Sequence, residues 1–96
     1  MSSRSYWVYI LASQKNGTLY TGVSNSLHRR ILQHRNGTVG SFTASYGVVR
    51  LVYFEQFRNV TNAIAREKQI KAGSRKRKID LIEGMNPEWL DLAEGW

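Results

Sequence analysis

The sequence predicts a single domain of the mixed α/β (α+β) class, with three β-strands and several helices. Alternating side chains over residues 6–12, 18–23 and 48–57 indicate the strands. Between and after them lie segments that begin at a Ser, Thr or Asn cap and end at glycine, as helices do. A chain of 96 residues can bury one modest core and has no room for a second lobe, so one domain over residues 1–96 is expected.

The first two strands are predicted to form a hairpin, with residues 13–17 as the turn. A two-residue turn at Asn16-Gly17 would pair Tyr9 with Ser24 and leave Tyr9 and Tyr20 on one face, about 13 Å apart along the strand. A longer loop would bring the two tyrosines closer. The sequence leaves the register open, and both phenols also suit ordinary half-buried strand positions.

A helix is predicted directly after the hairpin, with Ser24 or Asn25 as its N-cap and its end at Asn36-Gly37. Arg30 and His34 are four residues apart in it, so they share a face beside the apolar stripe. A guanidinium and an imidazole placed this way can reach into a cleft near the two tyrosines.

The second half of the chain is predicted to continue with a loop over residues 39–46 and the third strand over 48–57. In that strand one face would carry Leu51, Tyr53 and Glu55, and the other Val52 and Phe54.

A second long helix is predicted from Thr61 or Asn62, as its cap, to about Ala72, stopping at Gly73. Its apolar stripe would consist of Val60, Ala63, Ile64, Glu67 and Ile70. Glu67 does not fit this stripe, because a buried carboxylate is costly unless it has a basic partner, binds a metal or borders a cavity. An ion pair with a nearby arginine and a functional role are both consistent with this position.

A third helix is predicted from residue 75 to Gly84, and a last short helix over residues 86–89 with Asn86 as its N-cap and Pro87 in its first turn. The capping role would account for Asn86 without any function. Residues 75–78 are all basic, and positive charge at a helix N-terminus opposes the helix dipole. This arrangement favours the interpretation that these residues bind an external anion.

The charge distribution points to a polyanion as partner. The net charge is +7, all fourteen Lys and Arg lie in residues 1–78, and five of the seven acids follow them. Half of the positive charge lies in residues 66–78. Phosphate contacts by such residues supply most of the non-specific affinity for nucleic acid. The predicted nucleic-acid-binding residues are Lys68, Lys71, Arg75, Lys76, Arg77 and Lys78.

Several other classes of protein are excluded. The chain has no cysteine, so a disulfide scaffold, a thiolate nucleophile and Cys-ligated zinc drop out. It has no phosphate-binding loop, zinc peptidase motif or serine-type triad. The basic part holds only Glu55 and Glu67, too few carboxylates for a two-metal nuclease. Without a signal peptide or membrane-spanning run, a cytoplasmic protein that does not enter the membrane is expected.

The motifs together resemble the GIY-YIG nuclease family, in particular its small stand-alone members. Val8-Tyr9-Ile10 and Leu19-Tyr20-Thr21-Gly22 resemble the paired signature, and residues 26–34 are similar to the helix that follows it. The resemblance continues through residues 65–71 and ends in Asn86-Pro87-Glu88-Trp89. It implies a small three-stranded mixed or antiparallel sheet flanked by helices.

The resemblance also implies an activity, the hydrolysis of phosphodiester bonds in nucleic acid with one divalent cation. Glu67 would be the metal ligand for Mg²⁺ or Mn²⁺, since one carboxylate plus waters commonly holds such an ion beside a phosphate. Arg30 would bind the scissile phosphate and stabilise the charge of the transition state.

The remaining implied catalytic residues surround these two. Tyr9 or Tyr20 would position or deprotonate the attacking water, although a phenol needs a nearby cation or metal-bound water to lower its pKa before it can act as a base near neutral pH. His34 would hydrogen-bond within the site or contact the phosphate, and Asn86 would complete the pocket near the glutamate.

The interpretation that follows is a metal-dependent endonuclease acting on DNA, in DNA repair or in the processing of DNA structures, with a protein partner supplying specificity. The alternative is a non-catalytic nucleic-acid-binding module that uses residues 66–78. A protein-interaction adaptor with Trp89 and Trp96 as its working face is a third class. DNA and RNA are not distinguished by the sequence.

Overall fold

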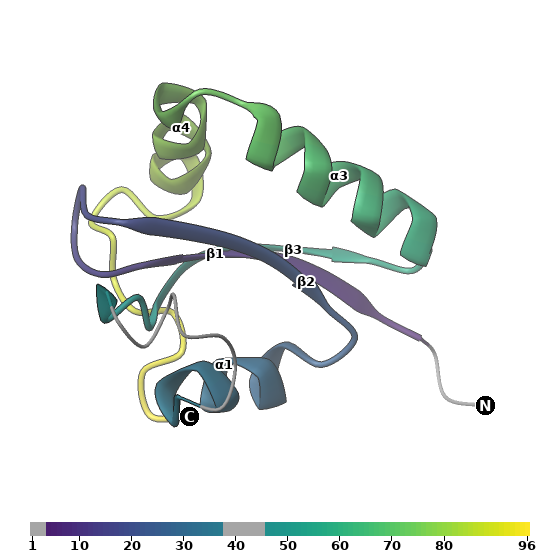
Figure 1. Ribbon diagram of the computed structural model, residues 1–96, viewed down its shortest axis with the longest axis horizontal. Coiled ribbons are helices and arrows are strands. Elements are labelled where there is room, and N and C mark those ends of the chain that lie inside the picture. The colour runs from purple at the N-terminus through teal and green to yellow at the C-terminus, as the bar shows by residue number, and fades with distance from the viewer. Residues whose placement is uncertain (1–3, 38–45) are drawn as a thin grey trace.

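The computed structural model describes residues 4–37 and 46–96, and these form an α+β fold with one sheet between two layers (Figure 1). Helices α3 and α4 cover one face of the sheet, and α1 lies on the other face together with the C-terminal segment. The elements are β1 Tyr6–Ala12, β2 Leu19–Ser24, α1 Leu27–Arg35, β3 Arg50–Phe57, α3 Val60–Ala72 and α4 Arg75–Met85. The predicted loop over residues 39–46 lies almost entirely outside the described residues.

The sheet is antiparallel, with the strand order β2-β1-β3. Tyr9 pairs with Gly22 rather than with Ser24, so the two-residue turn considered from the sequence is not the one adopted. The turn is longer: Ser13 N donates to Thr18 O at 3.0 Å, and Asn16 takes a left-handed φ of 60°. The longer loop draws the two signature tyrosines together, since Tyr20 pairs with Leu11.

The predicted strict alternation of β3 is wrong, because the strand contains a β-bulge. The pairing of β1 with β3 shifts between Ile10 and Leu11, which face Tyr53 and Leu51. Val52 is the extra residue, and it packs on the same side of the sheet as Tyr53. The bulge therefore turns Leu51 away from Tyr53, although strict alternation would place them together.

Helices α1 and α3 begin at other residues than the sequence suggested, whereas α4 begins at Arg75 as predicted. The N-cap of α1 is Ser26, and the side chain of Ser24 accepts a hydrogen bond from Ser26 N at 3.0 Å. The N-cap of α3 is Asn59, whose side chain accepts from Thr61 N and Asn62 N. In both helices the N-cap residue has an extended backbone conformation, as N-cap residues typically do. Helix α4 is capped by Ser74 and passes through Gly84 to end at Met85.

The predicted short helix over residues 86–89 is absent, and the described chain after α4 runs in turns. Trp89 adopts a φ of 55°, which is incompatible with a right-handed helix at that point. The segment crosses back under the sheet, where Leu92 N donates to Leu51 O at 2.8 Å. It thereby closes the side of the core that α1 leaves open.

The apolar core has one cluster on each side of the sheet. The cluster under α3 and α4 contains Val8, Ile10, Ile70, Ile82 and Trp89, and the cluster on the α1 side contains Tyr9, Leu11, Leu27, Ile31 and Leu51. The predicted stripe of α3 is only partly correct, because Ala63 and Ile70 are buried while Val60 and Ile64 are exposed. Among the described residues, no helix combines the length and apolar character needed to span a membrane.

Candidate active site

Tyr9, Tyr20 and His34 form an aromatic cluster on the α1 side of the sheet. The Tyr9 hydroxyl oxygen lies 3.0 Å from His34 Nε2, at hydrogen-bond distance. The ring centroids of Tyr9 and Tyr20 are 6.4 Å apart, and those of Tyr20 and His34 are 5.3 Å apart. The hairpin register and the last turn of α1 thus bring together three residues that the sequence singled out.

Gly22 makes room for the Tyr9 phenol. A Cβ at position 22 would lie 2.5 Å from the Tyr9 hydroxyl oxygen and 2.6 Å from Cζ. The two residues pair directly across the strands, so the phenol extends over the glycine toward the β2 edge of the sheet. Any side chain at position 22 would displace the phenol from His34.

Burial sets the protonation states of Tyr9 and His34. Tyr9 is 1% exposed, and its burial, with Tyr20 nearby, raises its pKa well above the ordinary value of a phenol. Burial also lowers the pKa of His34, and the positive charge of Arg30 lowers it further. Both groups are therefore neutral near pH 7, so the Tyr9 hydroxyl can donate to an unprotonated His34 Nε2.

Arg30 and Glu67 are the two charged residues that act on the Tyr9 phenol. Arg30 favours the phenolate of Tyr9 and Glu67 disfavours it, although the two residues come from different helices. Tyr9 is thus in hydrogen-bond contact with His34 and under the electrostatic influence of Tyr20, Arg30 and Glu67.

Glu67 has a basic partner, but it is not an arginine. Its carboxylate forms an ion pair with Lys71 at 2.8 Å, one turn further along α3, and its side chain is 13% exposed. Among the described residues no group of three or more His, Cys, Asp or Glu side chains could hold a metal ion. A site at Glu67 would therefore consist of one carboxylate with water and substrate oxygens, a donor set that suits Mg²⁺.

Asn86 is buried, and its amide group is engaged by the backbone of neighbouring segments. Its Nδ2 donates to Leu90 O at 2.7 Å and to Val52 O at 3.3 Å, and its Oδ1 accepts from Leu90 N. These contacts hold the C-terminal segment against β3, a positioning role different from the predicted N-cap. The catalytic role of Asn86 stays a prediction.

The six predicted nucleic-acid-binding residues divide into two groups. Three have partners within the protein: Lys71 pairs with Glu67, Lys76 pairs with Asp80 at 3.0 Å, and Arg75 donates to the carbonyl oxygens of the β1–β2 turn. Lys68, Arg77 and Lys78 form no ion pair with the described residues. The free positive charge is therefore smaller than the sequence suggested.

Sequence reasoning missed a second polar cluster on the α3 side of the sheet. The Arg66 Nε donates to Glu55 Oε2 at 2.8 Å, and the Tyr53 hydroxyl donates to the same oxygen. Burial and the bond to Glu55 raise the pKa of Tyr53 to about 12. The eleven-residue separation of Arg66 and Glu55 gives no periodic signal, and only the return of α3 over β3 brings them together.

The two tryptophans proposed as an adaptor surface differ in exposure. Trp89 is fully buried, and its indole nitrogen donates to Glu83 Oε2 at 2.9 Å. Trp96 is 41% exposed and packs beside His28, with ring centroids 5.2 Å apart. Because Trp89 belongs to the core, the pair does not form one exposed face.

Comparison with known proteins agrees with this architecture. The GIY-YIG catalytic domain matches residues 5–80. A UPF0213 protein of Clostridium perfringens is 46% identical over 76 residues, covering 79% of this chain and 81% of the relative. A UPF0213 protein of Syntrophus aciditrophicus is 39% identical over 87 residues, covering 90% of this chain and 97% of the relative.

A solved structure shows the same fold. The solution NMR structure of a UPF0213 protein from Bacillus halodurans superposes with a TM-score of 0.57 at 31% identity, covering 91% of this chain and 92% of that chain. GIY-YIG domains are endonuclease domains that generally use divalent metal ions and act on nucleic acid. These matches show that the chain belongs to the GIY-YIG catalytic domain family, and the contact between Tyr9 and His34 is consistent with them.

Proposed function

We propose that the protein is an endonuclease that hydrolyses phosphodiester bonds in DNA with one divalent cation, Mg²⁺ or Mn²⁺, held at Glu67. The observation that carries this proposal is the convergence on Tyr9 of a hydrogen-bonded imidazole and the charges of Arg30 and Glu67. DNA repair or the processing of DNA structures is the proposed setting, with a protein partner that supplies specificity.

The Tyr9–His34 contact suggests how a buried phenol can take part in the reaction. Tyr9 accepts a proton from the attacking water while its own proton passes to His34 Nε2, so no free phenolate forms. The water oxygen forms a new bond to phosphorus, and the bond to the leaving oxygen breaks. The products are a phosphate terminus and a hydroxyl terminus, the leaving oxygen taking a proton from solvent.

Arg30, Tyr20 and Glu67 complete the proposed mechanism. The guanidinium of Arg30 binds the scissile phosphate, where a planar and permanently charged group offsets the developing negative charge. Tyr20 is half-exposed and packs against His34, so it borders the access to Tyr9 and positions the water. Glu67 would hold a divalent cation, which would stabilise the negative charge that develops on the phosphate.

Replacing Glu67 by Gln tests the proposal, because the amide keeps the size of the side chain and removes its charge. Cleavage of a panel of duplex, branched and single-stranded DNA in Mg²⁺ or Mn²⁺ is expected to fall to the background rate, as loss of the sole carboxylate ligand implies. Binding of the same DNA is expected to be retained or slightly tighter, since a negative charge near the phosphates is removed.

The matched control is Glu88→Gln, which removes an exposed carboxylate outside the site. It is expected to cleave as the unaltered protein does. If the unaltered protein cleaves none of these substrates with either metal ion, the endonuclease proposal is wrong.

The Glu67–Lys71 ion pair favours a second candidate, a non-catalytic nucleic-acid-binding module. In such a module the ion pair would stabilise α3, and residues 66–78 would bind the phosphate backbone. DNA binding without cleavage, together with a loss of stability in Glu67→Gln, would support this candidate over the enzyme.

A further inference from the structure

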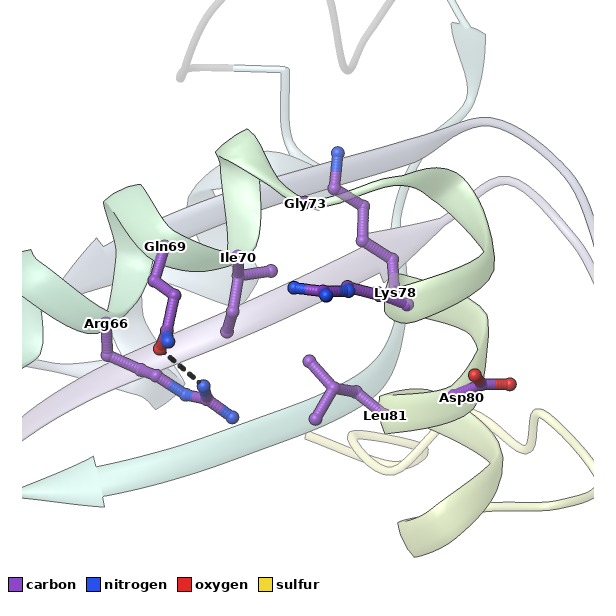
Figure 2. Close-up of a pocket in the computed structure, with 8 residues that line it drawn as sticks. Arg66, Gln69, Ile70, Gly73, Lys78, Asp80 and Leu81 are labelled. Carbon is purple, nitrogen blue, oxygen red and sulfur yellow. Dashed lines mark hydrogen bonds between the residues drawn. The ribbon is translucent and has the colours of Figure 1, made fainter.

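A groove with a volume of about 300 Å³ lies between α3 and α4 (Figure 2). Ile70 and Leu81 form its apolar walls, and the side chains of Arg66 and Gln69 lie along its α3 side. Because α3 and α4 meet at Gly73, the two helices diverge from this point and leave the space between them open.

The groove carries an excess of positive charge. Arg66, Arg77 and Lys78 line it, and Asp80 is the single acid among the lining residues. Asp80 pairs with Lys76, and the charge of Arg66 is offset by Glu55. Arg77 and Lys78 have no ion pair with the described residues, so both are available to an anion.

The apolar walls indicate more than a phosphate. Ile70 is 4% exposed and packs in the core, so its exposed edge is held in a fixed position, and Leu81 packs against the same cluster. A phosphate group gains nothing from such a surface, whereas a flat nucleobase would cover it. The Gln69 Oε1 accepts a hydrogen bond from Arg66 at 2.7 Å, which fixes the orientation of the Gln69 amide beside the groove.

We propose that this groove binds one unstacked nucleotide, with its base between Ile70 and Leu81 and its phosphate at Arg77 and Lys78. The inference deepens the proposed function and rests on nucleic acid being the substrate. In a regular duplex every base is paired and stacked, so only the backbone could reach the groove. The substrate class that fits is DNA with an unpaired nucleotide or a single-stranded arm.

The groove and the candidate active site each involve one of two adjacent residues of α3, Arg66 and Glu67. Arg66 bonds to Glu55 on β3, whereas the adjacent residue Glu67 acts on Tyr9 on β1. Successive positions on a helix differ by about 100° in direction, so α3 presents one residue to each site.

A titration with deoxyadenosine monophosphate followed by NMR, without metal, tests the inference independently of cleavage. Saturable shifts are expected at the methyl groups of Ile70 and Leu81. Inorganic phosphate and deoxyadenosine serve as probes of each half of the ligand, and both are expected to bind more weakly. Arg77→Gln combined with Lys78→Gln is expected to weaken nucleotide binding by about tenfold or more.

Lys15→Gln is the matched control, because it removes an exposed positive charge from the β1–β2 turn, outside the groove. It is expected to leave the affinity unchanged. Equal shifts with inorganic phosphate, or shifts that avoid Ile70 and Leu81, would overturn the inference.

The same variants then distinguish the substrate class. By fluorescence anisotropy without metal, the unaltered protein is expected to bind duplex DNA with one unpaired nucleotide more tightly than fully paired DNA. The Arg77→Gln, Lys78→Gln protein is expected to lose this preference. A preference that persists in the variant would contradict the inference, whereas absence of cleavage alone would count only against the proposed enzyme.

Discussion

At the scale of single residues, Tyr9 is the centre of the candidate site. Its phenol lies over Gly22, at hydrogen-bond distance from His34, and in the fields of Arg30 and Glu67. Tyr9 is surrounded by protein atoms rather than by water, so the position of its side chain is fixed before a substrate binds.

His34 gives a prediction for the pH dependence of stability. Its pKa in the folded protein lies below the ordinary value of 6.5, chiefly because it is buried. As the pH falls below about 6.5, the unfolded chain takes up a proton that folded His34 resists, so the free energy of unfolding decreases. Urea unfolding at pH 7.5 and 5.5 is expected to show this loss.

The comparison that isolates His34 uses both histidines. His34→Gln is expected to lose less stability over this interval than the unaltered protein, while His28→Gln, at an exposed position, is expected to follow the unaltered protein. Equal losses in all three proteins would show that other groups set the pH dependence.

The sequence singled out the residues that gather around Tyr9, but it did not indicate their partners. The signature positions and the misplaced charge at Glu67 drew attention to this group, and the catalytic roles of its members stay a prediction. Lys71 as the partner of Glu67, and the contact of Asn86 with Leu90, depend on side-chain packing that no spacing rule encodes.

At the scale of secondary-structure elements, α3 has the central role, because it contributes Glu67 to the candidate active site and lines the groove. Its apolar stripe is short, with Ala63 and Ile70 as its buried residues. The start of the helix therefore depends on its cap as well as on the core.

Replacing Asn59 by Ala tests this dependence. The side chain of Asn59 accepts from Thr61 N at 2.8 Å and Asn62 N at 3.2 Å, and its loss is expected to lower the free energy of unfolding by about 1 kcal/mol. Asn59→Asp, which keeps an acceptor, is expected to preserve stability. The measurement is urea unfolding followed by circular dichroism, and equal stability of the Ala and Asp variants would contradict the prediction.

The elements themselves were largely predictable, since periodicity and caps locate strands and helices to within a few residues. The hairpin register and the β3 bulge were not predictable, because both depend on how one strand pairs with its neighbour. The pairing of Tyr9 with Gly22 follows from a turn longer than Asn16-Gly17 alone would make.

At the scale of the whole molecule, the acidic C-terminal segment is part of the structure rather than a separate face. Asp91 forms an ion pair with Arg35 at 2.8 Å and accepts a hydrogen bond from Leu51 N, so it joins α1 to β3. Arg50 also donates to Trp89 O. Charge separation along the sequence was evident, but this use of the acids was not, since it depends on the segment folding back under the sheet.

Asp91→Ala is expected to lower the free energy of unfolding by about 1–2 kcal/mol, because it removes the partner of Arg35 and leaves Leu51 N without its acceptor. The side chain is partly exposed, so water limits the loss. Glu94→Ala removes an exposed acid from the same segment and is expected to have little effect. Comparable losses in both variants, measured by urea unfolding, would argue against the bridging role.

The path of this segment has a consequence for synthesis on the ribosome. The three strands are available once Phe57 has emerged, and their pairing can begin at that stage. Leu51 and Arg35 receive their contacts from Asp91, which lies 40 and 56 residues later. The nascent chain therefore exposes the apolar surface beside α1 until the segment that contains Asp91 has been made. A chaperone could bind this surface during that interval.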